Sequence, residues 1–364
     1  MSISTPPAFP CGGRPEQLAD QLLNAALAGD EHSAIELVVR ALDEGADPES
    51  ILLDVIAPVQ GKVGQEWAEN RINVAQEHAA TSINERVITA LGVHPAVGTS
   101  ITRGRITVAC VDGEWHALPA RLLSEVLKLR GWRIDYLGAQ LPTPHLIAHL
   151  HTTGADVVAL SSSIATRLPT THAAISACQA IGVPVLVGGA AFGPAGRYAK
   201  LLGADAWAPD ARAAADQLAR SPLSRPQLDH QPIDDLPHLA DQEYTLVTRN
   251  SDSLVRTVFA ALEDALPFMN EYSDLQRERT AEDLASIIEF LATALYLDDE
   301  DLFTGFITWT AQVLTARGVP AQSLRPTLHL LALELKDFPR ATRILRAATR
   351  TVTTRHSSEA GKPA

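Results

Sequence analysis

The hydrophobic pattern of the first 90 residues is helical. Apolar residues recur every three or four positions between Pro15 and Leu91, and turn residues such as Gly29 interrupt them. The predicted helices cover residues 16–28, 33–44, from 48 onward, and 74–91. Short connections favour antiparallel neighbours. The pattern therefore predicts a four-helix bundle over residues 14–96, preceded by a disordered segment at 1–13.

The pattern changes after Gly104, where short apolar runs alternate with helical stretches. The predicted strands are 106–111, 133–137, 157–161, 184–187 and 205–208, and the predicted helices are 118–130, 143–152, 168–181, 194–202 and 210–219. Strands that alternate with helices of this length indicate a parallel sheet covered on both faces. Residues 105–220 are therefore expected to form a flavodoxin-like, doubly wound α/β domain. The second strand alternates more than the others, as an edge strand does.

The last third of the chain has helical periodicity only. A proline-containing linker is predicted at 221–241, an all-α domain at 242–356 and a disordered tail at 357–364. The expected helix starts in the all-α domain are Ser251 or Asp252, Ser273 with Gln276 as a partial capping box, the acidic run 298–301, and Pro320. The fold class predicted for the whole chain is an α+β multidomain protein.

Composition and charge narrow the classes of protein to which this chain can belong. It has 364 residues, of which 46% are hydrophobic and 20% charged, which indicates a folded globular protein. The net charge of −13 argues against a nucleic-acid-binding surface. An apolar run of about 18 residues and a signal-peptide pattern are both absent, so no membrane partner is expected. The three cysteines lack metal-binding or redox spacing, which fits a cytoplasmic protein with Cys110 and Cys178 as inert core residues.

Glu114, Trp115 and His116 directly follow the first predicted strand. A loop at the carboxyl end of such a strand lies where α/β folds bind ligands. The Glu114 carboxylate can accept a hydrogen bond from one imidazole nitrogen of His116, which leaves the other nitrogen as a metal ligand. Asp112 is a second possible partner of the imidazole. The alternative is a solvated loop histidine without a ligand.

Three other predicted strand ends lie on the same edge of the sheet. Ser161 and Ser163 supply hydroxyl groups for a polar ligand. Gly188 and Gly189 allow a flat ligand to approach the backbone, and Pro209 follows the last strand. Ordinary turn chemistry is the alternative for each loop taken alone. The sequence lacks dinucleotide, P-loop and α/β-hydrolase motifs, and a single histidine is a poor zinc site.

A carboxylate-x-His after the first strand, Ser-x-Ser after the third and Gly-Gly after the fourth resemble the cobalamin-binding domain of methionine synthase, the mutases and their regulatory relatives. The resemblance implies that His116 is the lower cobalt ligand and that Glu114 orients it. It also implies that the nucleotide tail of cobalamin lies beside strands one, three and four. The usual motif of that family is Asp-x-His-x-x-Gly. Here Glu114 replaces the Asp and Pro119 replaces the Gly, which changes the local path expected for the nucleotide tail.

The helical module carries a second resemblance, in the stretch that contains Trp67, Val74, Glu77 and His78. This stretch is similar to the cap of the cobalamin-dependent photoreceptors related to the MerR regulators. In that family the Trp, Glu and His surround the 5′-deoxyadenosyl group, so the resemblance implies adenosylcobalamin. Members that form tetramers in the dark have a His after the cap Trp. Here that residue is Ala68, which leaves water or His78 as the upper ligand after illumination, and the family's DNA-binding helices do not precede the cap.

The C-terminal domain carries aromatic and basic residues at helical spacing. The candidate ligand residues are Tyr272, Arg277, Arg279, Tyr296, Arg325 and His329. Arginines can hold the carboxylates of a flat, conjugated ligand, and aromatic side chains can pack on its rings. A helical core with solvated charges is the alternative.

The C-terminal domain resembles the globin-like sensor domains of bacterial signalling proteins, and the whole arrangement resembles the photocobilins. That resemblance implies biliverdin as a second chromophore. The domain has no cysteine, so the bilin would be bound non-covalently. A haem with His329 as its ligand is the alternative for this domain.

The sequence thus predicts a light-sensing signalling protein and not an enzyme. Its predicted cofactors are adenosylcobalamin, with His116 on the cobalt, and biliverdin. Its expected partners are these small-molecule chromophores and an unidentified downstream signalling protein, and a homo-oligomer is compatible with the sequence. Two other functions stay open. One is a corrinoid carrier for a methyltransferase, and the other is a cobalamin sensor whose C-terminal domain docks a protein partner.

Overall fold

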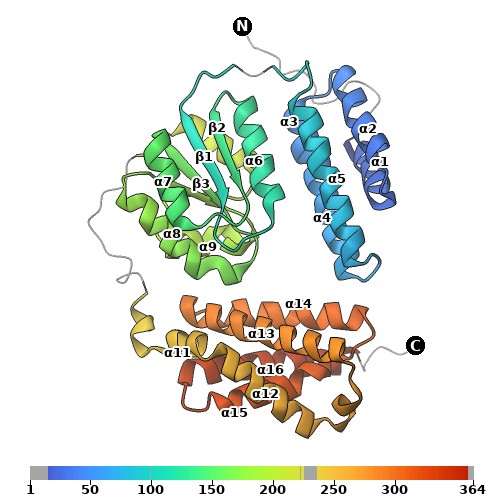
Figure 1. Cartoon of the computed structure of the whole chain (residues 1–364), viewed down its shortest axis with the longest axis vertical. Coiled ribbons are helices and arrows are strands. Elements are labelled where there is room, and N and C mark those ends of the chain that lie inside the picture. The colour runs from blue at the N-terminus through green and yellow to red at the C-terminus, as the bar shows by residue number, and fades with distance from the viewer. Residues whose placement is uncertain (1–14, 99, 222, 225–235, 360–364) are drawn as a thin grey trace. The chain divides into compact units, whose positions relative to one another are not determined.

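The computed structural model describes residues 15–98, 100–221, 223–224 and 236–359. The chain divides into two units, residues 1–232 and 233–364 (Figure 1). The predictions for residues 1–13 and for most of the linker at 221–241 fall outside the described residues. The last helix extends to Glu359, three residues into the predicted tail.

The first unit begins with a helical bundle. Its elements are α1 (Pro15–Ala28), α2 (Glu31–Asp43), α3 (Pro48–Ser50), the π-helical segment η1 (Ile51–Ile56), α4 (Ala57–Ala68) and α5 (Val74–Gly92). The third predicted helix is therefore interrupted by a wider turn, in which the Ala57 N–H bonds to the Leu52 carbonyl five residues earlier. Pro58 follows directly and has no N–H for the regular ladder, which favours the wider turn at this point.

A capping box fixes the start of α5. The side chain of Asn73 accepts the Gln76 N–H at 2.9 Å, and the side chain of Gln76 accepts the Asn73 N–H at 2.9 Å. The predicted start of this helix at Val74 is confirmed. Because the helix begins there, Glu77 and His78 lie near the turn that connects α4 to α5.

The rest of the first unit is built on a five-stranded parallel sheet. Its strands are β1 (Arg105–Cys110), β2 (Arg133–Gly138), β3 (Val157–Ser161), β4 (Val185–Gly188) and β5 (Ala206–Ala208). The strand order is β2-β1-β3-β4-β5, and each neighbouring pair is parallel. This confirms the predicted flavodoxin-like order, with β2 at the edge. Because β1 and β3 are neighbours, the loops that follow them meet at the carboxyl edge of the sheet.

Helices cover both faces of this sheet. They are α6 (Ala117–Leu129), α7 (Thr143–Thr153), α8 (Leu168–Ala180), α9 (Arg197–Leu201) and α10 (Ala211–Arg220). Helices α6 and α10 pack together on one face, and α7, α8 and α9 cover the other (Figure 1). Only α9 departs clearly from its predicted range of 194–202. It starts later because Ala195 and Gly196 have left-handed φ angles of 54° and 67°.

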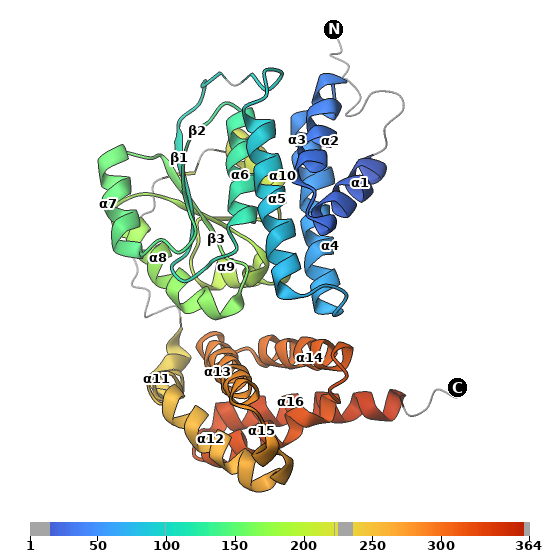
Figure 2. The ribbon, with the colours of Figure 1, turned by 45° about the vertical axis from the view of Figure 1, so that its right-hand side comes forward.

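Ion pairs join the bundle to the α/β domain at the α3 end. Arg130 donates to the Glu49 carboxylate at 2.6 and 2.9 Å, and Arg212 donates to Asp54 at 3.0 Å. The hydrogen bond from Arg130 holds the pKa of Glu49 below its usual range. The turn between α4 and α5 lies at the other end of α5 (Figure 2), a helix of 19 residues and hence about 28 Å long. This turn is thus the part of the bundle farthest from the ion pairs.

The described part of the second unit is helical. Its helices are α11 (Glu243–Arg249), α12 (Ser251–Ala265), α13 (Asp274–Leu297), α14 (Glu300–Ala316), α15 (Leu324–Glu334) and α16 (Pro339–Glu359). Helix α11 is not among the predicted elements. Asn250 stands at the N-cap of α12, so the expected cap at Ser251 or Asp252 is wrong. The all-α prediction is confirmed, whereas a globin-like arrangement stays a prediction.

The other predicted helix starts in this unit have mixed outcomes. The capping box of Ser273 and Gln276 at α13 is confirmed. Within the acidic run, Asp298 ends α13 with a left-handed φ of 50°, and Asp299 caps α14. Pro320 does not begin a helix, since α15 starts four residues later after a short 3-10 turn.

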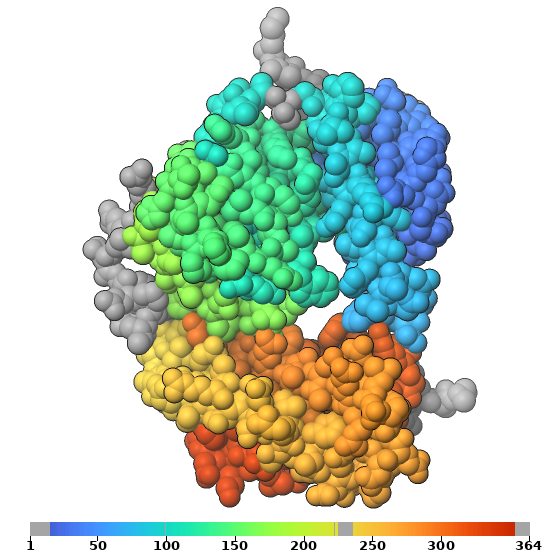
Figure 3. Space-filling view, viewed as in Figure 1, coloured from blue at the N-terminus to red at the C-terminus, as the bar shows by residue number. Residues whose placement is uncertain are grey.

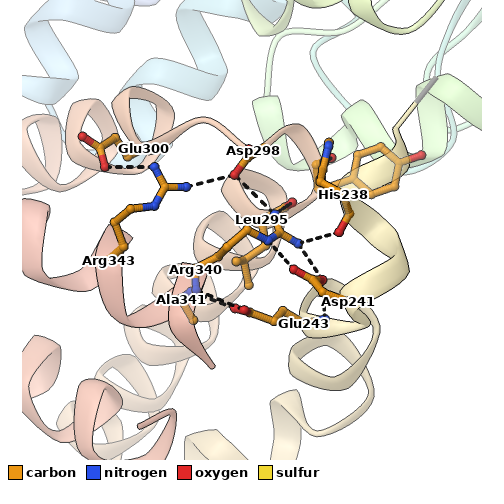
Figure 4. A network of polar contacts seen from close by, with 10 residues as sticks. His238, Asp241, Glu243, Leu295, Asp298, Glu300, Arg340, Ala341 and Arg343 are labelled. Carbon is orange, nitrogen blue, oxygen red and sulfur yellow. Dashed lines mark hydrogen bonds and ion pairs between the residues drawn. The ribbon is translucent and has the colours of Figure 1, made fainter. Parts of the chain in front are cut away.

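Arg340, at the start of α16, joins the segment before α11 to the body of the second unit (Figure 4). Its guanidinium donates to Asp241 at 2.8 Å and to the Leu295 carbonyl at 2.7 Å. The backbone N–H groups of Arg340 and Ala341 donate to the buried Glu243 carboxylate at 3.0 and 2.9 Å. Glu243 thereby satisfies two N–H groups that have no partner within their own helix.

Candidate cofactor site

Glu114 is the centre of the loop that follows β1, and its exposed fraction is 0%. Its Oε1 accepts the His116 backbone N–H at 2.9 Å and lies 2.7 Å from His116 Nδ1. Its Oε2 accepts the N–H groups of Ser163 at 2.6 Å and Ile164 at 3.0 Å. The Gln140 N–H donates to the Glu114 carbonyl at 2.9 Å. One residue therefore joins the loops after β1, β2 and β3.

The Glu114 carboxyl group is ionised at neutral pH. Burial raises its pKa, but the hydrogen bonds from His116, Ile164 and Ser163 outweigh burial and lower the pKa to about 2. A carboxylate only accepts hydrogen bonds, so His116 Nδ1 carries the proton. His116 Nε2 makes no hydrogen bond with the residues that the structure describes, and in the neutral imidazole it carries the lone pair.

The predicted contact between Glu114 and His116 is confirmed, whereas the second predicted partner is not. Asp112 makes no hydrogen bond or ion pair with a described residue, so it does not orient the imidazole. The physical reason is the turn at Gly113, whose left-handed φ of 77° separates the two acidic side chains. Glu114 is directed into the protein, where backbone N–H groups hold it.

Trp115 lies beside the imidazole of His116. The two rings are stacked with their centroids 3.9 Å apart, and the His78 ring of the bundle is 6.2 Å from the indole. The exposed fraction of Trp115 is 49%, and that of Val74 at the start of α5 is 57%. Large apolar side chains that stay exposed beside a cleft indicate a binding surface. Figure 3 shows the surface hollowed between the bundle and the α/β domain.

Three predicted residues of the bundle lie close to the turn between α4 and α5. Trp67 is half-buried near the end of α4, and Glu77 and His78 belong to α5. His78 Nδ1 lies 2.6 Å from Glu77 Oε2. The ring contact of His78 with Trp115 brings this part of the bundle to the loop after β1. The structure thus gathers residues that the sequence separates by about 40 positions.

The serines after β3 make hydrogen bonds with other parts of the protein. Ser161 is buried, and its carbonyl accepts the Val111 N–H at 3.1 Å. Ser163 binds the Glu114 carboxylate through its backbone N–H, as described above. Ser162, the middle residue of this serine run, is fully buried, and its hydroxyl lies 3.4 Å from Glu114 Oε2. The run of three serines was the available signal, but only the sheet order shows which of them faces Glu114.

The ends of β4 and β5 complete this edge of the sheet. Gly188 pairs with Ser161 and Ala208, and Pro209 follows β5 at the surface. Gly189 has a left-handed φ of 107°, and a Cβ at this position would lie 2.2 Å from the Ser162 carbonyl oxygen. Gly189 therefore permits the β3 and β4 loops to approach each other closely, whereas the approach of a flat ligand to the two glycines stays a prediction.

We expect Gly189→Ala to lower the free energy of unfolding of the first unit by about 2 kcal/mol or more, since it adds a backbone clash to a strained φ. Chemical denaturation followed by circular dichroism measures this loss. Gly182→Ala is the matched control, because Gly182 has a φ of 78° but open space around its Cβ position. The control should lose only about 1 kcal/mol from φ strain. Equal losses in both variants would show that the clash with Ser162 is relieved at no cost.

The residues at this edge fit a metal complex in which most of the atoms that bind the metal belong to the ligand and not to the protein. The described residues contain no group of three or more His, Cys, Asp or Glu side chains that could hold a metal ion. A corrinoid already supplies four nitrogen atoms to its cobalt and needs only one more from the protein. His116 Nε2, held in place through Nδ1 by a buried carboxylate, has the chemistry of such a donor.

The basic candidate residues near the start of α13 are engaged in surface ion pairs. Arg277 pairs with Glu263, and Arg279 pairs with Glu282 at 2.6 Å. Tyr272 is half-buried against the core of the second unit. These contacts agree with solvated charges on a helical core, the alternative that the sequence left open.

The remaining candidate residues lie elsewhere in the second unit. Tyr296 is on α13 about 28 Å from Arg277 along the helix axis, and it packs edge-on against Tyr244 with centroids 4.8 Å apart. Arg325 and His329 are exposed on α15. The structure therefore does not bring the six candidate chromophore residues together into one pocket.

Comparisons with known proteins agree with the geometry of the first unit. Residues 18–91 and residues 104–219 match two families that are each described as a B12 binding domain. A corrinoid protein of Desulfitobacterium hafniense is 25% identical over 203 residues, which are 52% of this chain and 91% of that protein. Dimethylamine corrinoid protein 1 of Methanosarcina acetivorans is 24% identical, over 54% of this chain and 93% of that protein. The HTH-type transcriptional repressor CarA of Myxococcus xanthus is 31% identical, over 45% of this chain and 54% of the repressor.

These relatives bear out the prediction that the chain is not an enzyme, since corrinoid proteins, repressors and B12 binding domains are binding proteins. Among the helices that the structure describes, none has the length and hydropathy to span a membrane. The helical bundle and the sheet coincide with the two matched regions. Residues 18–219 therefore form a helical and an α/β B12 binding domain in tandem, and the chain is a cobalamin-binding protein.

Proposed function

We propose that this protein is a light sensor that uses adenosylcobalamin. The observation that supports it is the position of His116, fixed by a buried carboxylate, next to a bundle turn that carries Trp67, Glu77 and His78. These three residues match the cap of the cobalamin-dependent photoreceptors related to the MerR regulators. When bound, adenosylcobalamin would supply a cobalt–carbon bond that green or blue light breaks.

In this proposal each residue of the site has a distinct task. His116 Nε2 would be the protein ligand of the cobalt, while Glu114 keeps the imidazole in one tautomer and one orientation. Gly188 and Gly189, together with the half-buried Ser163, would leave room for the nucleotide tail at the sheet edge. These small or hydroxyl-bearing residues carry no charge, so they would position the nucleotide tail by shape and by hydrogen bonds.

The bundle would enclose the adenosyl group with Trp67, Glu77 and His78. Loss of that group would leave the α4–α5 turn without its contacts, whereas the ion pair of Arg130 with Glu49 keeps the other end of the bundle attached. The turn would then have two positions, one with and one without the adenosyl group, and light would shift the populations of the two. A downstream partner would recognise one of the two positions.

Illumination of the full chain loaded with adenosylcobalamin tests the proposal. We expect a lasting change in the visible spectrum under green light, and at least about tenfold weaker cofactor retention in His116→Ala. A matched sample of the chain with hydroxocobalamin should not respond to the same light. An unchanged spectrum under illumination would refute the light-sensing function, although cobalamin binding would still stand.

A corrinoid carrier for a methyltransferase is the second candidate function. It is favoured by one observation, that corrinoid proteins align with this chain over more than nine-tenths of their own length. A carrier would exchange methyl groups with a partner enzyme, and its cap would not need Trp67. The variant Trp67→Ala therefore separates the two candidates: it should lower the retention of adenosylcobalamin relative to hydroxocobalamin only in the light sensor.

We also propose biliverdin as a non-covalent ligand of residues 242–356, on the resemblance to the photocobilins. The six candidate residues are dispersed, so we propose the aromatic group of Phe290, Phe306 and Trp309 as the bilin-binding surface instead. Phe290 and Phe306 are stacked with centroids 3.7 Å apart, and Trp309 is exposed beside them. Expression with a source of biliverdin should give a red absorption band that denaturation removes. Without such a band, the C-terminal unit is better explained as a docking surface for a protein partner.

A further inference from the structure

A series of side-chain hydrogen bonds crosses the bundle between α4 and α5, which lie side by side (Figure 1, Figure 2). Asn84 Nδ2 donates to Gln60 Oε1 at 2.8 Å, and Gln60 Nε2 donates to Thr81 Oγ1 at 2.7 Å. Thr81 Oγ1 in turn donates to Glu77 Oε1 at 2.8 Å. Each residue of the series therefore donates towards the next, and the last acceptor is the Glu77 carboxylate.

The series lies in a bundle core that is otherwise apolar. Asn84 has an exposed fraction of 0%, and its Oδ1 makes no hydrogen bond within the described part of the chain. The buried apolar residues of the same two helices include Val59, Val63, Val87 and Ile88. A buried polar network with an unpaired atom is less stable than an apolar core. Stability therefore does not explain why these positions are polar.

Thr81 departs from the hydrogen bond that a helical threonine commonly makes. Such a hydroxyl can donate to the backbone carbonyl four residues earlier, as Thr89 of the same helix does to Glu85 at 3.0 Å. Thr81 instead donates to the side chain of Glu77, four residues earlier, and accepts a hydrogen bond from Gln60 on α4. The contact with α4 thus directs the Thr81 hydroxyl to the carboxylate.

Hydrogen bonds hold the Glu77 carboxylate from two sides. Its Oε1 accepts from Thr81, its Oε2 lies 2.6 Å from His78 Nδ1, and its side chain is 19% exposed. A carboxylate has about four acceptor positions, so both oxygens can still accept a hydrogen bond from a ligand. A free glutamate side chain would lose conformational entropy when a ligand ordered it, and that loss weakens binding. A carboxylate that the protein has already ordered does not carry this cost.

We propose that Gln60, Thr81 and Asn84 position the Glu77 carboxylate as a hydrogen-bond acceptor, and that this sets the preference of the protein for a cobalamin with an adenosyl group over one without it. The inference rests on the proposed adenosylcobalamin site. The adenosyl group carries hydroxyl and amino donors for a fixed carboxylate, whereas hydroxocobalamin has only a water molecule or a hydroxide ion in that position. The three residues act through Glu77 and are positioning residues.

The test is the ratio of the dissociation constants of the full chain for adenosylcobalamin and for hydroxocobalamin, both measured in the dark. We expect Thr81→Val, which keeps the size of the side chain but loses the hydroxyl, to weaken adenosylcobalamin binding about tenfold and hydroxocobalamin binding less than about twofold. Thr81→Ser keeps the hydroxyl and should keep the ratio of the unchanged chain. Thr89→Val is the matched control, because it removes a hydroxyl of the same helix that donates to a backbone carbonyl. Since all samples stay dark, the outcome does not depend on the light response.

A double-mutant cycle with Glu77→Ala separates positioning of the carboxylate from a general effect on the bundle. If Thr81 acts through Glu77, Thr81→Val changes the ratio no further once Glu77→Ala is present. Gln60→Met removes the donor on α4 and should change the ratio in the same direction, which keeps the test open if Thr81→Val does not fold. An unchanged ratio in these variants, or the same loss with and without the Glu77 carboxylate, would overturn the inference while the cobalamin site stands. Equal ratios for the unchanged chain and Glu77→Ala would overturn the adenosyl site and the inference together.

Discussion

We expect replacement of Glu114 by Gln to lower the free energy of unfolding of the first unit by about 3 kcal/mol. The side chain keeps its size, but an amide nitrogen then faces the N–H groups of Ser163 and Ile164, or of His116, all of which now donate to carboxylate oxygens. At least one buried donor loses its partner, and buried unpaired groups carry the full cost of their lost hydration. Chemical denaturation of the full chain, followed by circular dichroism, measures the loss.

The pH dependence of this loss gives an independent check. The folded-state pKa of Glu114 is about 2, below its usual value of 4.5, because the hydrogen bonds to the carboxylate outweigh burial. Its contribution of about 3 kcal/mol is therefore fully present above pH 4.5 and is lost as the pH falls towards 2. The stability difference between the unchanged chain and Glu114→Gln should shrink over the same interval.

Asp112→Asn is the matched control for Glu114→Gln. Asp112 lies two residues away in the same loop but makes no hydrogen bond or ion pair with a described residue. Its replacement should change the free energy of unfolding by no more than about 0.5 kcal/mol. A loss in Asp112→Asn as large as that in Glu114→Gln would mean that the loop, and not the buried carboxylate, is the sensitive element.

Replacement of Arg340 by Ala is expected to destabilise the second unit by about 3 kcal/mol. The Arg340 side chain is only 14% exposed, and it satisfies Asp241 and the carbonyls of Leu295 and His238 together (Figure 4). The Arg340 guanidinium also holds the pKa of Asp241 below its usual range. Without it, Asp241 keeps its charge near the protein surface and loses its ion-pair partner, although it still accepts the Glu243 N–H at 3.0 Å. Hydrogen exchange should rise in peptides that cover residues 236–249 and the start of α16.

Arg343→Ala is the control for this variant, since Arg343 is one turn further along α16. Its side chain is 49% exposed and pairs with Asp298 at 2.9 Å. An exposed ion pair of this kind contributes less than about 1 kcal/mol. The two variants remove the same chemical group, so the difference between them isolates the effect of burial. Equal hydrogen exchange in both variants would contradict the role given to Arg340.

The local sequence alone predicted most of the fold of the first unit. The strand order and the edge position of β2 follow from alternating apolar runs and helices, and the structure confirms both. The start of α5 follows from the Asn73–Gln76 box. The individual elements depend on residues within about four positions of each other along the chain, so a pattern in the sequence carries them. The strand order followed instead from the alternation of strands and helices, which is typical of doubly wound folds. The turn at η1 departed from the pattern because Pro58 removes a single backbone donor.

The pairing of Glu114 with His116 was also within reach of the sequence, because the two residues are only two positions apart. Its contacts with Ser163 and Ile164 were not, since they cross about 50 positions and depend on β1 and β3 being neighbours. The same holds for the contact between His78 and Trp115. In each case the contact depends on how the sheet and the bundle bring distant segments together.

In the second unit, the arrangement of the helices could not be predicted from the sequence. Helical spacing predicted its helices but not their mutual arrangement, so residues that look alike on separate helices, such as Arg277 and Arg325, were assigned to one pocket. The network of Arg340, which reaches residues about 100 positions earlier, had no local signal. The sequence by itself determined the elements, their order and the chemistry at each strand end. Only the tertiary structure decided which of these groups meet, because burial and hydrogen bonding between distant segments depend on how the elements pack.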